Sequence, residues 1–549
     1  MSNLQINTRV RRLAYYLDDF EKGNFRIPFF QRRYRWSKPE KRRDLFDSII
    51  KGFPIGTILL WKPNDDIQFN PEYEDRNIGS YTLEAPNEYA SYILDGFQRL
   101  STIVGCLLNP NTTNLVRDEE EWLANFNLIY NFKNNKVEIG PKNYDNLDFY
   151  KVPLYQLADT KEFYNIQTKF AEHRNLMNED EIKDYISKFK EIAYQIQDYM
   201  LPSVDILGGD FETANQMFVR VNTQGEKVND EEQLSAITST ESFRLGARIT
   251  EVLDNISNTN FFNKIKKESF RENIFRTIQS SFGTLYLDSK ATDVKTLSDK
   301  TNFSEIVNVT LKNCIETVIF FKENLAVLDL KFVPANLHFI FLVQYYNIKG
   351  KLENEDVEKL KLWFWQTSYT NCFTKYNPAK RKKAFDHFLD FCKNKENDPF
   401  YWDNEVKLKV DKFPDKIDFG GVRKQALANF MVNYYFHKDN ILTKKKLSSE
   451  EITGVNEYKL FRNEKSIGNT IFLPIQKNEL YVHLKKQTSL QFLLSYEFQG
   501  LYEELFITDE MRYLYSQKRN KELLELRELM IKKQENEFIT NVLNLELEN

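Results

Sequence analysis

The stretch SYILDGFQRLSTI, residues 91–103, passes from an apolar run through an Asp-Gly pair into a helical pattern. Residues 92–96 are typical of a buried strand, and residues 97–108 are typical of a helix. A strand that feeds a helix leaves free backbone N–H groups at the helix start, where phosphate groups bind well. A plain turn closed by an ion pair between Asp95 and Arg99 would give the same pattern, and spacing alone does not separate the two.

The side chains at this junction suit a bound phosphate chain. Gly96 lets a ligand approach the main chain closely, and the Arg99 guanidinium can bridge two phosphate oxygens. Asp95 would repel phosphate unless it holds a divalent metal ion, orients a water molecule or pairs with Arg99. Gln98, in the first helical turn, could fix a polyphosphate or an attacking water. We therefore treat Asp95, Gln98 and Arg99 as candidate catalytic residues, and Asp95 also as a candidate metal ligand.

The sequence around this stretch mixes helical and strand patterns up to about residue 240, and the pattern is almost wholly helical from there to about residue 400. The elements expected in the mixed part are a helix over residues 9–23, a strand over 25–36, a helix over 37–52, a strand over 53–61, a hairpin over 127–140, helices within 159–200, a strand over 201–206 and a helix over 210–225.

Composition bounds the class of protein. A chain of 549 residues exceeds the roughly 250 to 300 residues that one hydrophobic core holds, so several domains are expected. A net charge of −4 excludes a globally basic nucleic-acid binder, and any basic surface must be local. Four cysteines without a CxxC pair indicate a reducing cytoplasm. The start of the chain lacks a signal-peptide pattern, and the richest apolar stretch, residues 337–346, is far shorter than a membrane span.

A basic segment, QRRYRWSKPEKRR at residues 31–43, interleaves Tyr34 and Trp36 with seven positive charges and a single acid. This mixture is typical of surfaces that hold phosphates and stack bases. The structural alternative is a solvated edge strand whose charges prevent aggregation. The candidate DNA contacts are Arg33, Arg35 and Trp36 in this segment and Lys380, Arg381 and Lys382 in a second basic run.

Three separated segments are more specific together than any of them alone. They are IPFFQRRYRW at residues 27–36, an Asp-Gly-x-Gln-Arg-Leu-x-Thr segment that begins at Asp95, and a Phe-x-x-x-Asn-x-x-Gly segment at residues 218–225. In this order and rough spacing they resemble the N-terminal domain of the GmrSD-type modification-dependent restriction enzymes. The resemblance covers roughly residues 10–240. The family usually has Asp-Gly-Gln-Gln-Arg, whereas Phe97 stands at the middle position here, so nucleotide preference or turnover rate could differ.

The resemblance implies a ParB/sulfiredoxin-like fold that binds and hydrolyses nucleoside triphosphates. It implies nucleotide-binding roles for Gln31, Arg32, Gly96, Thr102 and Asn222, beside the catalytic candidates given above. It also implies a divalent metal ion, Mg²⁺, as a cofactor of the triphosphate.

Relatives often carry a C-terminal HNH-type nuclease. SIGNTIFLPIQKN, residues 466–478, resembles the second element of that site and contains Asn469 and Asn478. For the first element, a His-Ile-Leu-Pro segment, the best match puts Asn440 at the place of the histidine base. Asparagine cannot accept a proton near neutral pH, so the base is absent in this register. His437 is a substitute only if the loop is shifted, and we expect a degenerate nuclease site.

We therefore expect an α+β protein with a ParB/sulfiredoxin-like domain at residues 1–240, a helical domain at 241–400 and a mostly helical HNH-like domain at 401–549. The expected function is triphosphate hydrolysis that gates DNA engagement or cleavage in a cytoplasmic bacterial restriction or anti-phage defence system. Modified or phage DNA, a second copy or a defence subunit are the expected partners, and no membrane is expected. The alternatives are a non-catalytic sensor of modified DNA, a docking subunit for a separate nuclease, and a structural scaffold.

Overall fold

The computed structural model divides the chain into two compact units, Met1–Ser242 and Phe243–Asn549. The first contains a mixed sheet and the second is mainly helical, so the expected α+β class is confirmed. The further division of the second unit at residue 400 stays a prediction. The structure describes residues 4–548 except 29, 30, 32, 33, 37, 64–73, 85–89, 145, 146, 174–177, 223–229, 239–242, 263–266, 287–295, 395–397, 449–451, 463, 477–489 and 495–501.

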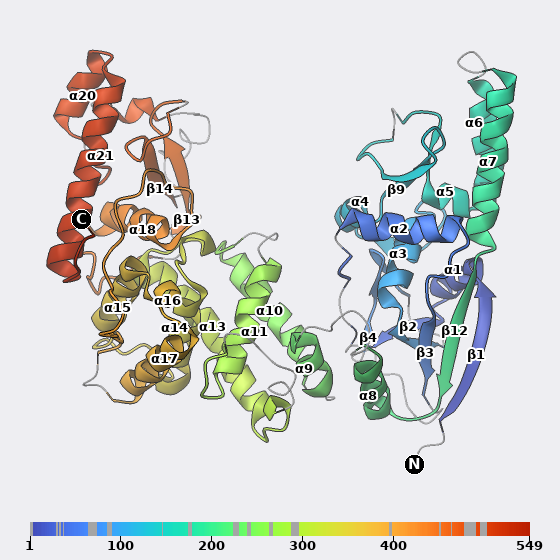
Figure 1. Cartoon of the computed structure of the whole chain (residues 1–549), viewed down its shortest axis with the longest axis horizontal. Helices are drawn as coiled ribbons and strands as arrows, with labels where there is room; N and C mark the ends of the chain where they lie inside the picture. Colours follow the sequence, from blue (N-terminus) through green and yellow to red (C-terminus); the bar gives the residue numbers. More distant parts are fainter. Residues whose placement is uncertain are drawn as a thin grey trace. The chain divides into compact units, whose positions relative to one another are not determined.

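A six-stranded sheet organises the first unit, with the order β1-β12-β3-β7-β2-β4. β7 pairs parallel with β2 and antiparallel with β3, so the ends of β7 and β2 and the start of β3 lie at one edge. Figure 1 shows β1, β12 and β3 side by side. The strands are β1 Gln5–Arg12, β2 Phe25–Pro28, β3 Ile58–Lys62, β4 Glu74–Asp75, β7 Ser91–Asp95 and β12 Met200–Leu207.

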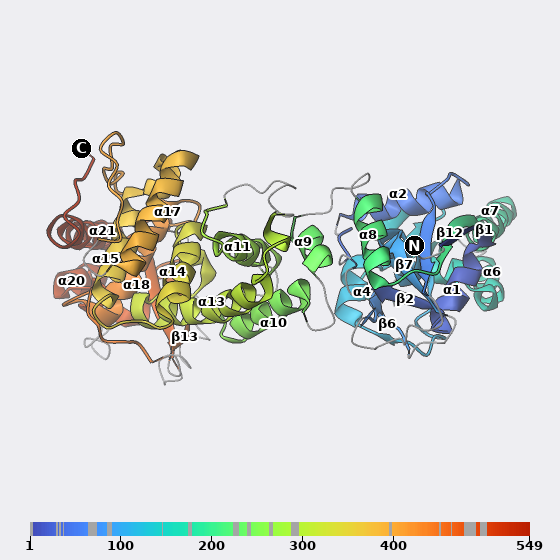
Figure 2. The ribbon, with the colours of Figure 1, turned by 90° about the horizontal axis from the view of Figure 1, so that it is seen from below.

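Helices cover both faces of this sheet, so the apolar run of β7 is buried on both sides. Ile93 belongs to the large core of the unit. Tyr92 and Leu94 point the other way and pack with Ala214 and Phe218 of the helix α8. α1 lies beside the end of α7 in both views of the ribbon (Figures 1 and 2). The helices named here are α1 Leu13–Glu21, α2 Pro39–Ile50, α3 Phe97–Leu107, α7 Glu179–Gln197 and α8 Phe211–Asn222.

The segment that decides the fold has the expected form, a strand Ser91–Asp95 followed by the helix Phe97–Leu107. The hairpin predicted over residues 127–140 is also confirmed, with β9 Leu128–Asn131 antiparallel to β10 Lys136–Ile139. The predicted helix over residues 9–23 is wrong in its first part, because Gln5–Arg12 is the strand β1. It pairs with β12 over its whole length, and such long-range pairing overrides local periodicity.

Two predicted strands are shorter than expected. The strand β2 ends at Pro28, and residues 34–36 are irregular rather than a strand. The strand β3 begins at Ile58, and the residues before it form a loop that follows α2. Both irregular segments lie next to the edge at which β7 ends, and they supply most of the contacts described below.

The second unit packs its helices around an aromatic core. α14 carries the most apolar stretch of the chain and is buried all round, as expected of a central helix in a helical domain. No described helix combines the length and the apolar character that a membrane span requires. The main elements are α10 Leu245–Asn258, α11 Lys267–Ser280, α13 Phe303–Leu325, α14 Asn336–Lys349, α15 Val357–Thr370, α17 Pro378–Lys393, α18 Val422–His437, the antiparallel pair β13 Ile452–Lys459 and β14 Thr470–Gln476, α20 Asp509–Ser516 and α21 Asn520–Glu537.

A buried histidine should make this unit sensitive to acid. His338 is fully buried in α14, with Nε2 2.8 Å from Thr367 Oγ1, and burial lowers its pKa to about 3. Below the unfolded value of about 6.5 the unfolded chain takes up a proton that the folded chain excludes, so stability falls as the pH falls. We expect a loss of about 2 kcal/mol in the free energy of unfolding between pH 6.5 and 5.

Denaturant unfolding at the two pH values measures this loss. His338→Gln removes the titrating group and should flatten the difference between the two pH values. Equal pH dependence in wild type and His338→Gln would show that other groups cause the acid sensitivity.

Candidate functional site

The turn between β7 and α3 is built around Gly96 and Arg99. Gly96 has a φ of 92°, and a Cβ at this position would lie 2.4 Å from Ile58 Cδ1. The backbone angle therefore favours glycine, and any larger residue would also have to displace the end of the Ile58 side chain. Arg99 Nη2 donates to Asp95 Oδ2 at 3.0 Å, so the ion pair considered in the sequence is present. The two side chains keep 18% and 29% of their surface exposed, which leaves the pair at the surface of the unit.

Arg99 also fastens the loop that precedes β3. Its Nη1 donates to the carbonyl of Ile55 at 2.8 Å, and its Nη2 donates to the carbonyl of Thr57 at 3.0 Å. Gly56, between these carbonyls, has a φ of 92°, and a Cβ there would lie 2.3 Å from Arg99 Nη1. Among the described residues, the contacts of this pair run through Nη1 and Nη2 of Arg99 and Oδ2 of Asp95, which leaves Nε of Arg99 and Oδ1 of Asp95. These are the atoms of the pair with which a ligand can bind.

Two glutamines bring the basic segment to the same edge. Gln31 Nε2 donates to the carbonyl of Ile93 at 2.8 Å, two residues before Asp95 in β7. Gln98 Oε1 accepts a hydrogen bond of 2.7 Å from the backbone N–H of Arg35. Gln31, Asp95, Gly96, Gln98 and Arg99 therefore meet at one edge of the sheet. Gln98 is only 6% exposed, and its oxygen holds the basic segment in place.

Thr102 lies one turn further along α3 and is fully buried. Its Oγ1 is 2.9 Å from the hydroxyl of Tyr34 and donates to the carbonyl of Gln98 at 2.9 Å. Burial raises the pKa of Tyr34, whose ring packs on Phe126 with centroids 4.8 Å apart. Thr102 thus fixes the aromatic part of the basic segment to α3 from inside the unit.

The described part of the basic segment carries both exposed and buried charges: Arg35, Lys38 and Lys41 are exposed, whereas Arg42 is buried and donates to the carbonyl of Asn125. Tyr34 and Trp36 pack against the core, whereas Arg35 is exposed. Arg32 and Arg33 lie outside the described residues. Asn222 is the last residue of α8, and its side chain is likewise outside the description.

Sequence reasoning missed the loop of residues 54–57, which was assigned to a strand. Two of its carbonyls bind Arg99, and its Gly56 makes room for the guanidinium. The signal available in the sequence is a glycine two residues after Pro54, which marks a turn rather than a strand interior.

The second basic run has mixed surroundings. Lys380 Nζ lies 2.9 Å from Asp403 Oδ1 and 2.8 Å from Glu405 Oε2, so its charge is largely neutralised. Arg381 Nε donates to the carbonyl of Tyr376 at 2.9 Å, and Lys382 is exposed. Of the three predicted DNA contacts in this run, Lys382 is the one that lies open to a phosphate.

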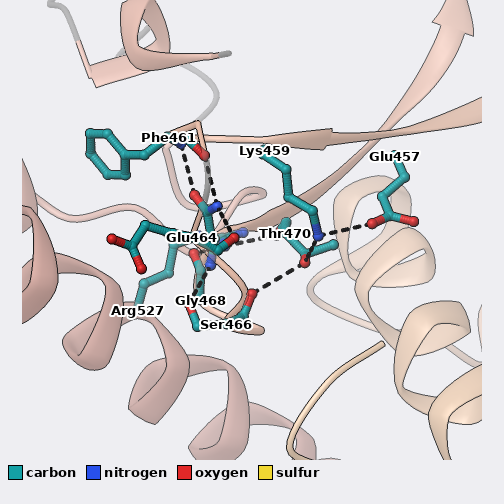
Figure 3. A network of polar contacts seen from close by, with 9 residues as sticks. Glu457, Lys459, Phe461, Glu464, Ser466, Gly468, Thr470 and Arg527 are labelled. Atoms are coloured by element: carbon teal, nitrogen blue, oxygen red, sulfur yellow. Dashed lines mark hydrogen bonds and ion pairs between the residues drawn. The ribbon is translucent and has the colours of Figure 1, made fainter. Parts of the chain in front are cut away.

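In the C-terminal region, Asn469 braces a tight turn before β14. Figure 3 shows Phe461, Glu464, Gly468 and Thr470 around this turn. It is fully buried, accepts from the N–H of Phe461 at 2.8 Å, and donates to the carbonyls of Phe461 and Glu464 at 2.9 and 2.8 Å. Arg527 of α21 donates to the carbonyls of Gly468 and Thr470 on either side. All side-chain atoms of Asn469 that can bond are therefore used within the turn. Asn478 lies outside the described residues.

His437 ends α18, and Asn440 closes the turn that follows. Burial, followed by the positive charges of Lys361 and Lys445, lowers the pKa of His437 to about 4. His437 is therefore neutral at pH 7, but it is a weak base. Asn440 Oδ1 accepts from the N–H of Leu442 at 2.9 Å and so has a local structural role.

The described residues contain no group of three or more His, Cys, Asp or Glu side chains that could hold a metal ion. Mg²⁺ that also binds phosphates and water needs only one or two carboxylates from the protein. Asp95 fits this requirement through Oδ1, because its Oδ2 is taken by Arg99.

Comparison with known proteins identifies the N-terminal region. Residues 13–239 match the family model of the GmrSD restriction endonuclease N-terminal domain, so the resemblance is confirmed there. An uncharacterized protein of Methanocaldococcus jannaschii is 22% identical over 459 residues, which cover 77% of this chain and 73% of that protein. The HNH-like character of the C-terminal region stays a prediction.

Proposed function

We propose, from the GmrSD-type N-terminal domain in residues 13–239, that the protein targets DNA in a restriction or defence system and hydrolyses a nucleoside triphosphate. Nucleotide turnover would gate DNA engagement or cleavage. The observation that carries the proposal is the convergence of Gln31, Asp95, Gly96 and Arg99 at one edge of the sheet, where a helix begins.

Each residue has a defined part in this proposal. The backbone N–H groups at the start of α3 bind the triphosphate tail, and Gly96 allows its close approach. Arg99 holds Asp95 through Nη2 and contributes its Nε–H to a phosphate oxygen. Asp95 holds a Mg²⁺ ion or positions the attacking water through Oδ1. When bound, Mg²⁺ would neutralise charge on the phosphates.

The same helical turn supports a link from nucleotide to DNA. Gln98 lies in the first turn of α3 and binds the backbone of Arg35, which is exposed in the basic segment. A ligand that shifts the start of α3 therefore shifts Arg35. Gln98 and Thr102 act as positioning residues in this account, and Arg32, Arg33 and Asn222 remain proposed ligand contacts.

The second candidate function is a non-catalytic sensor of modified DNA, or a docking subunit for a separate nuclease. The ion pair of Arg99 and Asp95 favours it, because the same contacts also close a purely structural turn. The weak basicity of His437 favours it as well, because a nuclease base works best with a pKa near the operating pH.

Phosphate release and equilibrium nucleotide binding together test the proposal. The full chain is incubated with ATP, GTP, CTP or UTP, with Mg²⁺ or with EDTA, and with or without modified DNA. We expect release of phosphate from at least one triphosphate that stops in EDTA and changes when DNA is added. Binding without release would support the sensor, and neither binding nor release under any condition would overturn the nucleotide site.

A further inference from the structure

The N-terminal strand β1 forms an exposed edge of the sheet. Among the described strands it pairs only with β12, and it lies at the end of the strand order. Ile6 is 68% exposed and Val10 is 59% exposed, although both are strand residues with apolar side chains. Figure 1 shows β1 at the outer side of the sheet, next to β12. Such an edge is a template for pairing with another strand.

The register of β1 with β12 determines which backbone N–H and C=O groups of β1 point away from β12. Val10 stands opposite Pro202 in this antiparallel pair. Proline has no N–H, so this pair fits only a position where the two residues do not exchange hydrogen bonds. Val10 therefore directs its N–H and C=O away from β12. Because the pattern repeats every second residue, Thr8 and Ile6 do the same.

The same three residues also share one face of the strand, since side chains alternate along it. On β12, this face continues with Pro202 and Val204, which are half-buried, and with Met200, which is 52% exposed. Ile6, Val10 and these neighbours form an apolar surface beside the open backbone edge. An exposed strand of this kind is usually protected by charges or by a partner.

We propose that β1 pairs antiparallel with β1 of a second copy, around a two-fold axis at Thr8. In this register Ile6 faces Val10 of the second copy, and Thr8 faces Thr8, so the outward backbone groups meet each other. Two apolar faces join into one, and the two sheets become continuous. A strand can pair with a second copy of itself in this way only if the residues that face each other across the axis are compatible.

The charges of β1 are compatible with this register. Arg9 faces Asn7 of the second copy and Arg11 faces Gln5, so no arginine opposes another. Each arginine is also paired within its own chain, with Asp205, Asp19 and Asp198 for Arg9, Arg11 and Arg12 at 2.9, 2.7 and 3.5 Å. The positive charges of this edge are therefore already paired, so they offer little attraction to an acidic peptide and little repulsion to a second copy.

Sedimentation of the full chain and two charge variants test the pairing. Wild type is expected to be a dimer at micromolar concentration. Ile6→Lys with Val10→Lys sets like charges opposite each other across the axis and should weaken the dimer about tenfold or more. Ile6→Lys with Val10→Glu sets opposite charges against each other and should keep it. Tyr164→Lys, at a residue that is 79% exposed in α6 (Phe163–Glu172), is the control and should leave the dimer unchanged.

Cross-linking checks the register. Thr8→Cys places one new thiol on the axis, and the four native cysteines are all buried. A short bifunctional thiol reagent should therefore link the chains of this variant and not those of wild type. A monomeric wild type, equal dimer affinity of the two charge variants, or a dimer that does not cross-link through position 8 would each overturn the proposal.

Discussion

Asp95→Asn is expected to lower triphosphate turnover by about 100-fold or more while the fold is retained. The amide oxygen of asparagine can still accept the hydrogen bond that Arg99 Nη2 donates, so the turn keeps its geometry. The negative charge that holds a metal ion or activates water is lost. Because the pair is partly exposed, we expect the free energy of unfolding to change by less than about 1 kcal/mol.

A matched control separates this effect from a general change of charge. Asp47 forms an exposed ion pair with Lys51 on α2. Asp47→Asn should leave the rate of phosphate release and the thermal midpoint as in wild type. If Asp95→Asn hydrolyses triphosphate at the wild-type rate, Asp95 has no part in the chemistry, and the structural reading of the turn holds.

Arg99→Lys separates the role of Arg99 in holding the loop before β3 from the role of its positive charge. A lysine carries the same charge, but it has no planar fork that can bind Ile55, Thr57 and Asp95 together. This variant should therefore loosen the loop before β3 and lower the thermal midpoint, whereas Asp95→Asn should not. The two variants together tell whether turnover depends on the position of the loop or on the carboxylate.

The sequence predicts the β7–α3 junction well because its determinants are local. An apolar run, a glycine and a helical pattern lie within residues 91–103, and each of them acts on its immediate neighbours. The sequence does not predict β1, because its partner β12 lies nearly the length of the unit away along the chain. The pattern of residues 9–12 also fits the helix that follows, and only pairing with β12 decides between the two.

The side-chain roles at the site likewise differ between local contacts, which the sequence predicts, and long-range contacts, which it does not. The ion pair of Asp95 and Arg99 spans one helical turn, so spacing is enough to expect it. Gln98 and Thr102 were expected to contact a ligand, yet their described hydrogen bonds hold Arg35 and Tyr34. Those contacts depend on how a segment some 65 residues earlier docks on α3, which local pattern does not reveal.

The C-terminal region shows why a short motif does not fix a role. Ile467, Gly468 and Asn469 were matched to a segment beside a nuclease metal site. In the fold the asparagine satisfies backbone groups of Phe461 and Glu464, and Gly468 is required because a Cβ would lie 2.0 Å from the carbonyl of Leu524. These contacts give the motif a structural role in the turn before β14, beside α21, and its nuclease role stays a prediction.

Glu535→Gln is expected to destabilise the second unit by about 3 to 5 kcal/mol, the cost of breaking a buried ion pair from one side. Arg423 of α18 donates to both carboxylate oxygens of Glu535 at 2.7 Å, and the hydroxyl of Tyr369 in α15 donates to one of them at 2.9 Å. Glu535 is fully buried in α21. The glutamine amide can accept only one of the two hydrogen bonds from Arg423, and the guanidinium charge is left without its partner.

Denaturant unfolding measures this loss, and two further variants show its origin. Glu522→Gln breaks an exposed ion pair of the same helix and should change the free energy of unfolding far less than Glu535→Gln does. Arg423→Met combined with Glu535→Met removes both charges and should recover most of the stability. Because Arg527 of α21 also holds the turn before β14, hydrogen exchange at residues 468–470 should rise in Glu535→Gln and return in the double variant. If the double variant is as unstable as the single one, the pair contributes through packing rather than through its charges.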